Sequence, residues 1–267
     1  MMNILALLNR ALNGRIPRYV YALYKKRAIV NALNNRLDPC NANVPFGYLL
    51  DERIVEYPWL FSRLNNLNGK LLDAGSVLNF HYLLSRPELS AKDIFISTLA
   101  PEKHAYWHRG ISYVYEDMRD ICYKDNYFDC IACLSVLEHV GMDNTMLYTS
   151  DPLKKEKTPT SFLSVVSELH RVLKPGGVLF ISVPFGEQRN YGWLQIFNGG
   201  MIDSIVDTFK PLSYSESYLR YLDNGWEASS RVGVSNCQYY DLHDKSRAYR
   251  DDRAIAAEGV VLLELKK

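Results

Sequence analysis

After Lys70 the sequence alternates between short apolar runs and helical stretches, and this alternation constrains the fold more than any other feature. Strands separated by helices pair in parallel, and the helices cover both faces of the resulting sheet. The pattern therefore predicts an α/β fold. Its expected strands are 70–74, 93–98, 111–116, 127–135 and 177–183, and its clearest helix is 159–173. A last strand is expected at 258–267, with residues 212–219 as its antiparallel partner.

Size and composition indicate one main folded domain with additions. Apolar residues make up 48% of the 267 residues, enough to bury a large core, and a net charge of +1 gives no argument for nucleic-acid binding. Cys130 and Cys133 form a CxxC pair within a predicted strand, where residues three apart face opposite sides, so a zinc or redox role is not favoured. No grouping of His, Asp and Glu has the spacing of metal ligands.

The first 37 residues are basic and contain no acidic side chain. Residues 2–12 and 19–36 are both predicted to form amphipathic helices. One interpretation is a helical cap with a solvated basic face, a second is attachment to an anionic membrane surface, and a third is a transit peptide. We expect residues 1–54 to form a basic helical extension and residues 55–267 to form the main domain.

The sequence also bears on localisation. No apolar stretch reaches the ~18 to 20 residues needed to cross a bilayer. Arg10, Arg15 and Arg18 interrupt the apolar core that a signal peptide would need. We therefore expect a cytoplasmic protein, with peripheral contact at the inner face of the membrane as the alternative that the basic segment leaves open.

Three short elements carry candidate chemistry. The first strand ends in Asp73 and is followed by Gly75, where the backbone can turn tightly and approach a ligand. Asp117 follows the third predicted strand, and His139 follows the fourth. Because ligands of such sheets bind at the carboxyl ends of the strands, we expect these side chains to lie around one site.

These elements resemble the class I S-adenosylmethionine (SAM)-dependent methyltransferases. The resemblance rests on three motifs: "SVLEHV" (135–140), "RVLKPGG" (171–177) and "SVP" (182–184). These motifs are similar to those of the methyltransferase type 11 branch. Together with "EYPW" (56–59) and "WLQIFNGGMI" (193–202), these motifs are also similar to a bacterial family found among surface-polysaccharide genes. The resemblance implies a Rossmann-like, doubly wound, seven-stranded, mostly parallel sheet with an antiparallel last strand. It also implies SAM as cofactor and a small-molecule or glycan acceptor.

The resemblance assigns roles to individual residues. Those implied to bind the cofactor are Asp73, Gly75 and Ser76 at its methionine end, Thr98 at the ribose position, Asp117 and Met118 at the adenine, and Ser135 beside the sulfonium. An oxygen or nitrogen acceptor must also lose a proton, so a general base is expected. His139 is the preferred candidate, although it could only brace its turn, and Glu187 in the loop after the fifth strand is the second.

The chain departs from the family pattern at three positions. Val77 and Asn79 stand where further glycines are usual, and Thr98 stands where an acid usually holds the ribose hydroxyls. Threonine cannot give the bidentate grip of a carboxylate, and Glu102 in the following loop is a possible substitute. These departures keep two alternatives open. One is a catalytically degenerate domain that serves as a binding or scaffold module, and the other is a different enzyme on the same fold.

The acceptor pocket is expected to come from the inserts 142–160, 186–200 and 220–250. Aromatic side chains there could stack on sugar rings or simply build loop cores; they are Tyr148, Tyr191, Trp193, Trp226, Tyr239 and Tyr240. His104 and His108 are interpreted as surface residues. The expected function is methyl transfer to a sugar or surface-polysaccharide component.

Overall fold

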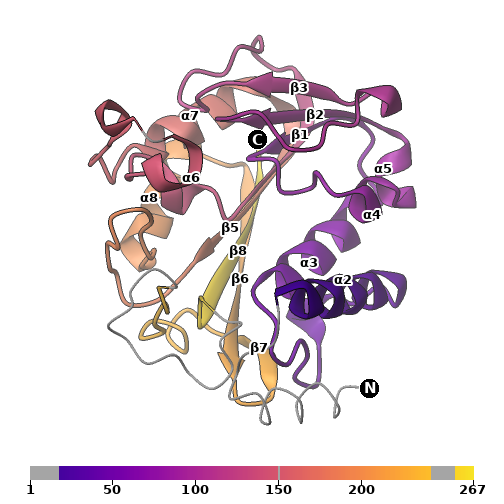
Figure 1. The fold of residues 1–267 in the computed structure, drawn as a ribbon, viewed down its shortest axis with the longest axis vertical. Helices are drawn as coiled ribbons and strands as arrows, with labels where there is room; N and C mark the ends of the chain where they lie inside the picture. The colour runs from indigo at the N-terminus through magenta and orange to yellow at the C-terminus, as the bar shows by residue number, and fades with distance from the viewer. Residues whose placement is uncertain (1–17, 150, 242–255) are drawn as a thin grey trace.

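The computed structural model describes residues 18–149, 151–241 and 256–267. At its centre is one eight-stranded sheet with the order β3-β2-β1-β4-β5-β8-β6-β7 (Figure 1). The strands are β1 (Gly69–Ala74), β2 (Lys92–Thr98), β3 (Ser112–Tyr115), β4 (Phe128–Leu134), β5 (Leu173–Pro184), β6 (Ser213–Leu222), β7 (Gly225–Ser229) and β8 (Gly259–Lys266). The α/β prediction and its predicted strands are confirmed.

Strand order fixes where a ligand can bind. From β1 the chain builds outward to β2 and β3, then returns to the other side of β1 with β4 and β5, all in parallel. The order thus reverses between β1 and β4, and a crevice opens outside the carboxyl ends of these two strands. The antiparallel β8 closes this half of the sheet against β5 and pairs in turn with β6, as the sequence predicts.

The expected number of seven strands is wrong, because β7 adds an eighth at the edge beyond β6. Leu222 pairs with Gly225, so only Asp223 and Asn224 form the hairpin loop. Neither of these two residues has a positive φ; the residue that does is Gly225, directly after them. Gly225 itself has a φ of 123°, and a Cβ there would lie 2.3 Å from the Phe46 carbonyl oxygen. The first part of the expected 220–250 insert is therefore sheet.

Helices cover both faces of the sheet (Figure 1). One face carries α3 (Arg53–Leu64), in which Trp59, Leu60 and Leu64 are buried, with the short helices α4 (His81–Leu84) and α5 (Pro87–Ser90) beside it. The other face carries α7 (Phe162–Val172) and α8 (Gly199–Phe209). Cys130 packs in the first core and Cys133 in the second, as their spacing on a strand predicts. The remaining helical segments are α2 (Arg18–Asn34), α6 (Thr145–Tyr148), η1 (Pro39–Asn41), η2 (Trp107–Arg109), η3 (Leu137–His139) and η4 (Pro152–Lys154).

The described part of the N-terminal segment belongs to the first core. Ile29 and Leu33 of α2 are buried in it, and Lys25 forms an ion pair with Asp51. The expected domain boundary after residue 54 falls inside α3. The predicted helix 2–12 lies outside the described residues. Within the part that is described, no helix is both long and apolar enough to cross a membrane.

Candidate functional site

A cavity of about 780 Å³ lies at the carboxyl ends of β1, β2, β3 and β4. Its walls come from the turn after β1, the loops after β2 and β3, the segment after β4, the insert that holds α6 and η4, and the first residue of α3. Six residues predicted for the site line it, namely Gly75, Thr98, Asp117, Met118, Ser135 and His139. Asp73, Ser76 and Glu187 are not among the residues that line it.

Asp73 braces the turn after β1. Its carboxylate is fully buried and accepts hydrogen bonds from the backbone N–H groups of Val77 at 3.0 Å and Leu78 at 2.8 Å. Burial raises the pKa of this carboxyl to about 7, against the opposing effect of those two hydrogen bonds. Asp73 thus stabilises the turn from the side that faces away from the cavity lining. Its predicted contact with the methionine end of a cofactor stays a prediction.

Gly75 and Ser76 form the tip of the same turn. Gly75 has a φ of 112°, and a Cβ there would lie 2.3 Å from Cγ2 of Val136, so no other residue fits without displacement. Ser76 also has a positive φ, of 62°, and its buried Oγ has no hydrogen-bond partner. A strained turn with an orphaned hydroxyl is typical of a ligand site.

Acidic side chains gather at the ends of β2 and β3. Asp117 accepts hydrogen bonds from the backbone and guanidinium of Arg119, and the guanidinium also contacts both carboxylate oxygens of Glu156 at 2.7 and 2.8 Å. Hydrogen bonds from Arg119 lower the pKa of Asp117, so this carboxylate is ionised at neutral pH. The same contacts tie the loop after β3 to the insert that carries α6.

Glu116 is a cavity residue that the sequence reasoning missed. Its backbone N–H donates to the carbonyl of Thr98, and its carboxylate accepts hydrogen bonds from Ser97 Oγ at 2.8 Å and the Cys122 backbone at 2.9 Å. It therefore sets a carboxylate beside the position where Thr98 lacks one. Glu102, the substitute expected from the sequence, does not line the cavity.

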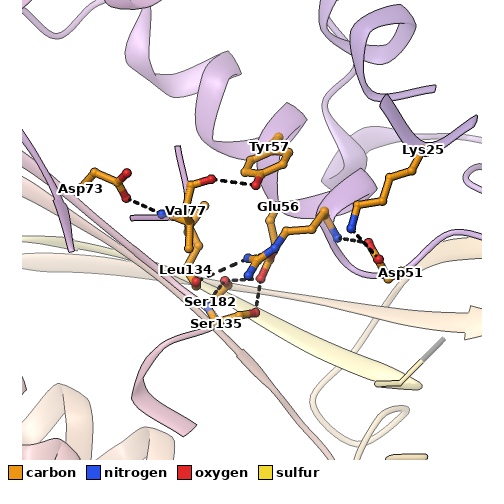
Figure 2. A network of polar contacts seen from close by, with 10 residues as sticks. Lys25, Asp51, Glu56, Tyr57, Asp73, Val77, Leu134, Ser135 and Ser182 are labelled. Carbon is orange, nitrogen blue, oxygen red and sulfur yellow. Dashed lines mark hydrogen bonds and ion pairs between the residues drawn. The ribbon is translucent and has the colours of Figure 1, made fainter. Parts of the chain in front are cut away.

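Arg53, at the start of α3, is a second cavity residue that the sequence reasoning missed. Its Nη1 donates to the carboxylate of Glu56 and, at 3.4 Å, to the carbonyl of Leu134. Glu56 is fully buried and accepts hydrogen bonds from Ser135 Oγ and Ser182 Oγ, each at 2.5 Å (Figure 2). Glu56 thus ties α3 to the ends of β4 and β5. The available signal was the i, i+3 spacing of Arg53 and Glu56, the first residue of the "EYPW" motif.

His139 stands at the end of η3 with its ring oriented by Trp193. Nδ1 lies 3.1 Å from the carbonyl oxygen of Trp193, and the two rings pack with centroids 5.2 Å apart. A carbonyl only accepts, so Nδ1 carries the hydrogen and Nε2 of the neutral ring keeps a lone pair. Burial lowers the pKa of His139, which favours this neutral form. The geometry suits a proton acceptor at the cavity wall.

Asn144 is the third residue that was missed. Its Nδ2 donates to the carbonyls of His139 at 2.6 Å and Met142 at 3.1 Å, which fixes the orientation of the amide. Its buried Oδ1 has no partner. Asn144 lines the cavity and holds the segment from His139 to the insert in one conformation.

Other predicted residues lie elsewhere. Glu187 accepts a hydrogen bond from Gln238 beside a separate hollow of about 70 Å³. Of the expected aromatic residues only Tyr148 lines the main cavity, while Trp226 is buried in the core. His104 and His108 are exposed, as predicted. Among the described residues there is no cluster of three or more His, Cys, Asp or Glu side chains that could hold a metal ion.

Comparison with known proteins identifies the segment around this cavity. Residues 74–181 match the sequence model of a family described as "Methyltransferase domain", and no curated protein matches the sequence. The matched segment covers less than half of the chain and contains most of the residues that line the cavity. Arg53, Glu56 and Trp193 lie outside the matched segment.

Solved structures are similar at low sequence identity. One is a 1,6-didemethyltoxoflavin-N1-methyltransferase from Burkholderia thailandensis with bound S-adenosylhomocysteine (SAH), at 12% identity and a TM-score of 0.48 over 100% of this chain and 89% of the other. Another is the N-methyltransferase NodS from Bradyrhizobium japonicum with SAH, at 13% and 0.42 over 89% and 98%. A third is the [4+2]-cyclase SpnF, at 19% and 0.45 over 91% and 94%. These TM-scores are too low to indicate an activity for this chain.

Proposed function

We propose that this protein transfers the methyl group of SAM to the oxygen or nitrogen of a small-molecule acceptor, and that the acceptor is a sugar or surface-polysaccharide component. The observation that carries the proposal is the cavity itself. It combines the strained Gly75–Ser76 turn, the acids after β3 and a neutral, oriented His139 at the edge where β1 and β4 diverge.

The residues present fit this cofactor. Asp117 and Glu116 place carboxylates in the cavity beside the ends of β2 and β3, and the buried, unpartnered hydroxyl of Ser76 lies in the turn next to the lining residue Gly75. We assign Asp117 and Met118 to the adenine, and Glu116 together with Thr98 to the ribose hydroxyls. Because Arg119 already occupies the Asp117 carboxylate, an adenine amino group would share those oxygens with the guanidinium.

When bound, SAM would supply an electrophilic methyl group on a sulfonium sulfur, a leaving group that can accept the bonding electron pair. The protein aligns the acceptor atom with that methyl, which is its largest contribution to such a displacement. His139 Nε2 takes the proton that the acceptor atom loses, while the Trp193 carbonyl holds the ring through Nδ1. The wall that holds Val140, Met142 and Tyr148 gives the acceptor an apolar surface.

The sugar acceptor rests on the resemblance to the polysaccharide-gene family and on Tyr148, whose face could stack on a sugar ring. The test is SAH formation from SAM in the presence of nucleotide sugars, free glycans and, for comparison, simple amines. We expect turnover with at least one sugar-containing acceptor and none without acceptor. Turnover with amines alone would refute the sugar assignment while leaving methyl transfer in place.

A further inference from the structure

The guanidinium of Arg53 is placed to bind an anion inside the cavity. Arg53 lines the cavity wall, and its side chain keeps 21% of its surface exposed. The hydrogen bonds to Glu56 and to the Leu134 carbonyl both leave from Nη1. Nε and Nη2 have no hydrogen-bond partner among the described residues, and neither nitrogen is sealed from solvent. A guanidinium presents its donors as a planar fork that matches a carboxylate.

The support behind Arg53 is rigid. Glu56 is fully buried, and its carboxylate is held by Ser135 Oγ and Ser182 Oγ at the ends of β4 and β5 (Figure 2). The Leu134 carbonyl fixes the guanidinium against the end of β4. Asp73, in contrast, directs its carboxylate to the backbone N–H groups of Val77 and Leu78 and does not line the cavity. Among the described residues that line the cavity, Arg53 is therefore the cationic group at the β1–β4 end.

We infer that Arg53 binds the α-carboxylate of the methionine part of the cofactor. The inference rests on the proposed function, because it needs SAM in this cavity. The methionine part is the only section of SAM or SAH that carries a carboxylate, and the adenine end is already assigned to the loop after β3. Helix α3, which precedes the matched methyltransferase segment, thus completes the cofactor site.

Calorimetric titration with two ligands tests the inference. One ligand is SAH, and the other is S-adenosyl-3-thiopropylamine, which is SAH without its carboxylate. We expect the wild-type protein to bind SAH roughly tenfold to a hundredfold more tightly than the decarboxylated ligand. In Arg53→Ala that preference should disappear, because SAH affinity falls and affinity for the decarboxylated ligand stays the same.

Control variants separate recognition from folding. Arg63→Ala removes another arginine of α3, which contacts Glu264 and Asp38 and does not line the cavity, so it should keep the wild-type preference. Arg53→Ala leaves the Glu56 carboxylate buried without its cation, so the double variant Arg53→Met, Glu56→Gln provides a neutral replacement. It too should bind both ligands equally.

The contrary outcomes separate failure of the Arg53 assignment from failure of the proposed function. Wild-type protein that binds both ligands with equal affinity overturns the assignment of Arg53 and leaves the proposed function standing. A folded double variant that still prefers SAH also overturns it. Wild-type protein that binds neither ligand refutes the proposed function itself.

Discussion

At the residue scale, the proposed proton transfer depends on which nitrogen of His139 is free. The Trp193 carbonyl at 3.1 Å selects the tautomer with a hydrogen on Nδ1, and burial lowers the pKa of the ring. Both effects prepare Nε2 as a proton acceptor at neutral pH. The adjacent Glu138 does not line the cavity; its side chain is buried in the protein, and this burial raises the pKa of its carboxyl.

His139→Asn should lower the transfer rate by about 10² to 10⁴-fold and leave SAH binding unchanged, because asparagine keeps a polar side chain but cannot take a proton. In the wild-type protein kcat/KM should be full at neutral pH and fall as acid protonates His139. The midpoint should lie below the ordinary histidine value of 6.5, because the pKa is lowered in the folded protein. Rate measurements from pH 5 to 8 check this. An acid limb that persists in the variant would show that another group titrates.

At the element scale, the turn after β1 positions the cavity. Gly75 meets Val136, which follows β4, so the ends of the two central strands approach closely only because position 75 has no side chain. Asp73 stabilises the same turn through two backbone N–H groups. On the opposite wall, Arg119 joins the loop after β3 to the insert through Asp117 and Glu156.

Gly75→Ala should lower the free energy of unfolding by about 2 to 4 kcal/mol, because it adds a clash with Val136 to the strain of a positive φ. Gly176→Ala is the matched control. Gly176 also has a positive φ, of 78°, but a Cβ there meets nothing within 4 Å, so about 1 kcal/mol is expected. Denaturant unfolding of both variants measures the difference. Equal losses would mean that the contact with Val136 is not what requires glycine.

The sequence predicts some of these elements better than others. Alternating apolar runs locate the parallel strands because each buried strand carries its own local pattern, and the Asp117–Met118 and His139 motifs follow those strands directly. Glu116 and Asn144 have no such pattern, since their roles arise from partners that only the folded chain brings close. The sequence does not predict strand β7, because its hairpin lies in a segment that resembles an insert. Glu187 was predicted for the site because its loop follows the fifth strand, but that loop leads away from the cavity.

At the scale of the whole molecule, the cavity includes residues outside the segment that matches the methyltransferase-domain model. The matched residues 74–181 supply most of the cavity wall, but Arg53 comes from α3, and the ring of His139 is oriented by Trp193 beyond β5. Helix α3 is itself fixed to the sheet through Glu56. The N-terminal helices α2 and α3 are thus part of the folded unit, and their removal would take Arg53 away from the cavity lining.

Calorimetric titration of the purified full-length protein with SAM and SAH tests the central claim most directly. The account predicts binding of both in the micromolar range, weakened about tenfold to a hundredfold in Asp117→Ala through loss of the adenine contact. A protein that shows a cooperative thermal transition but binds neither ligand at millimolar concentration would contradict the account and favour a binding or scaffold module on a methyltransferase fold.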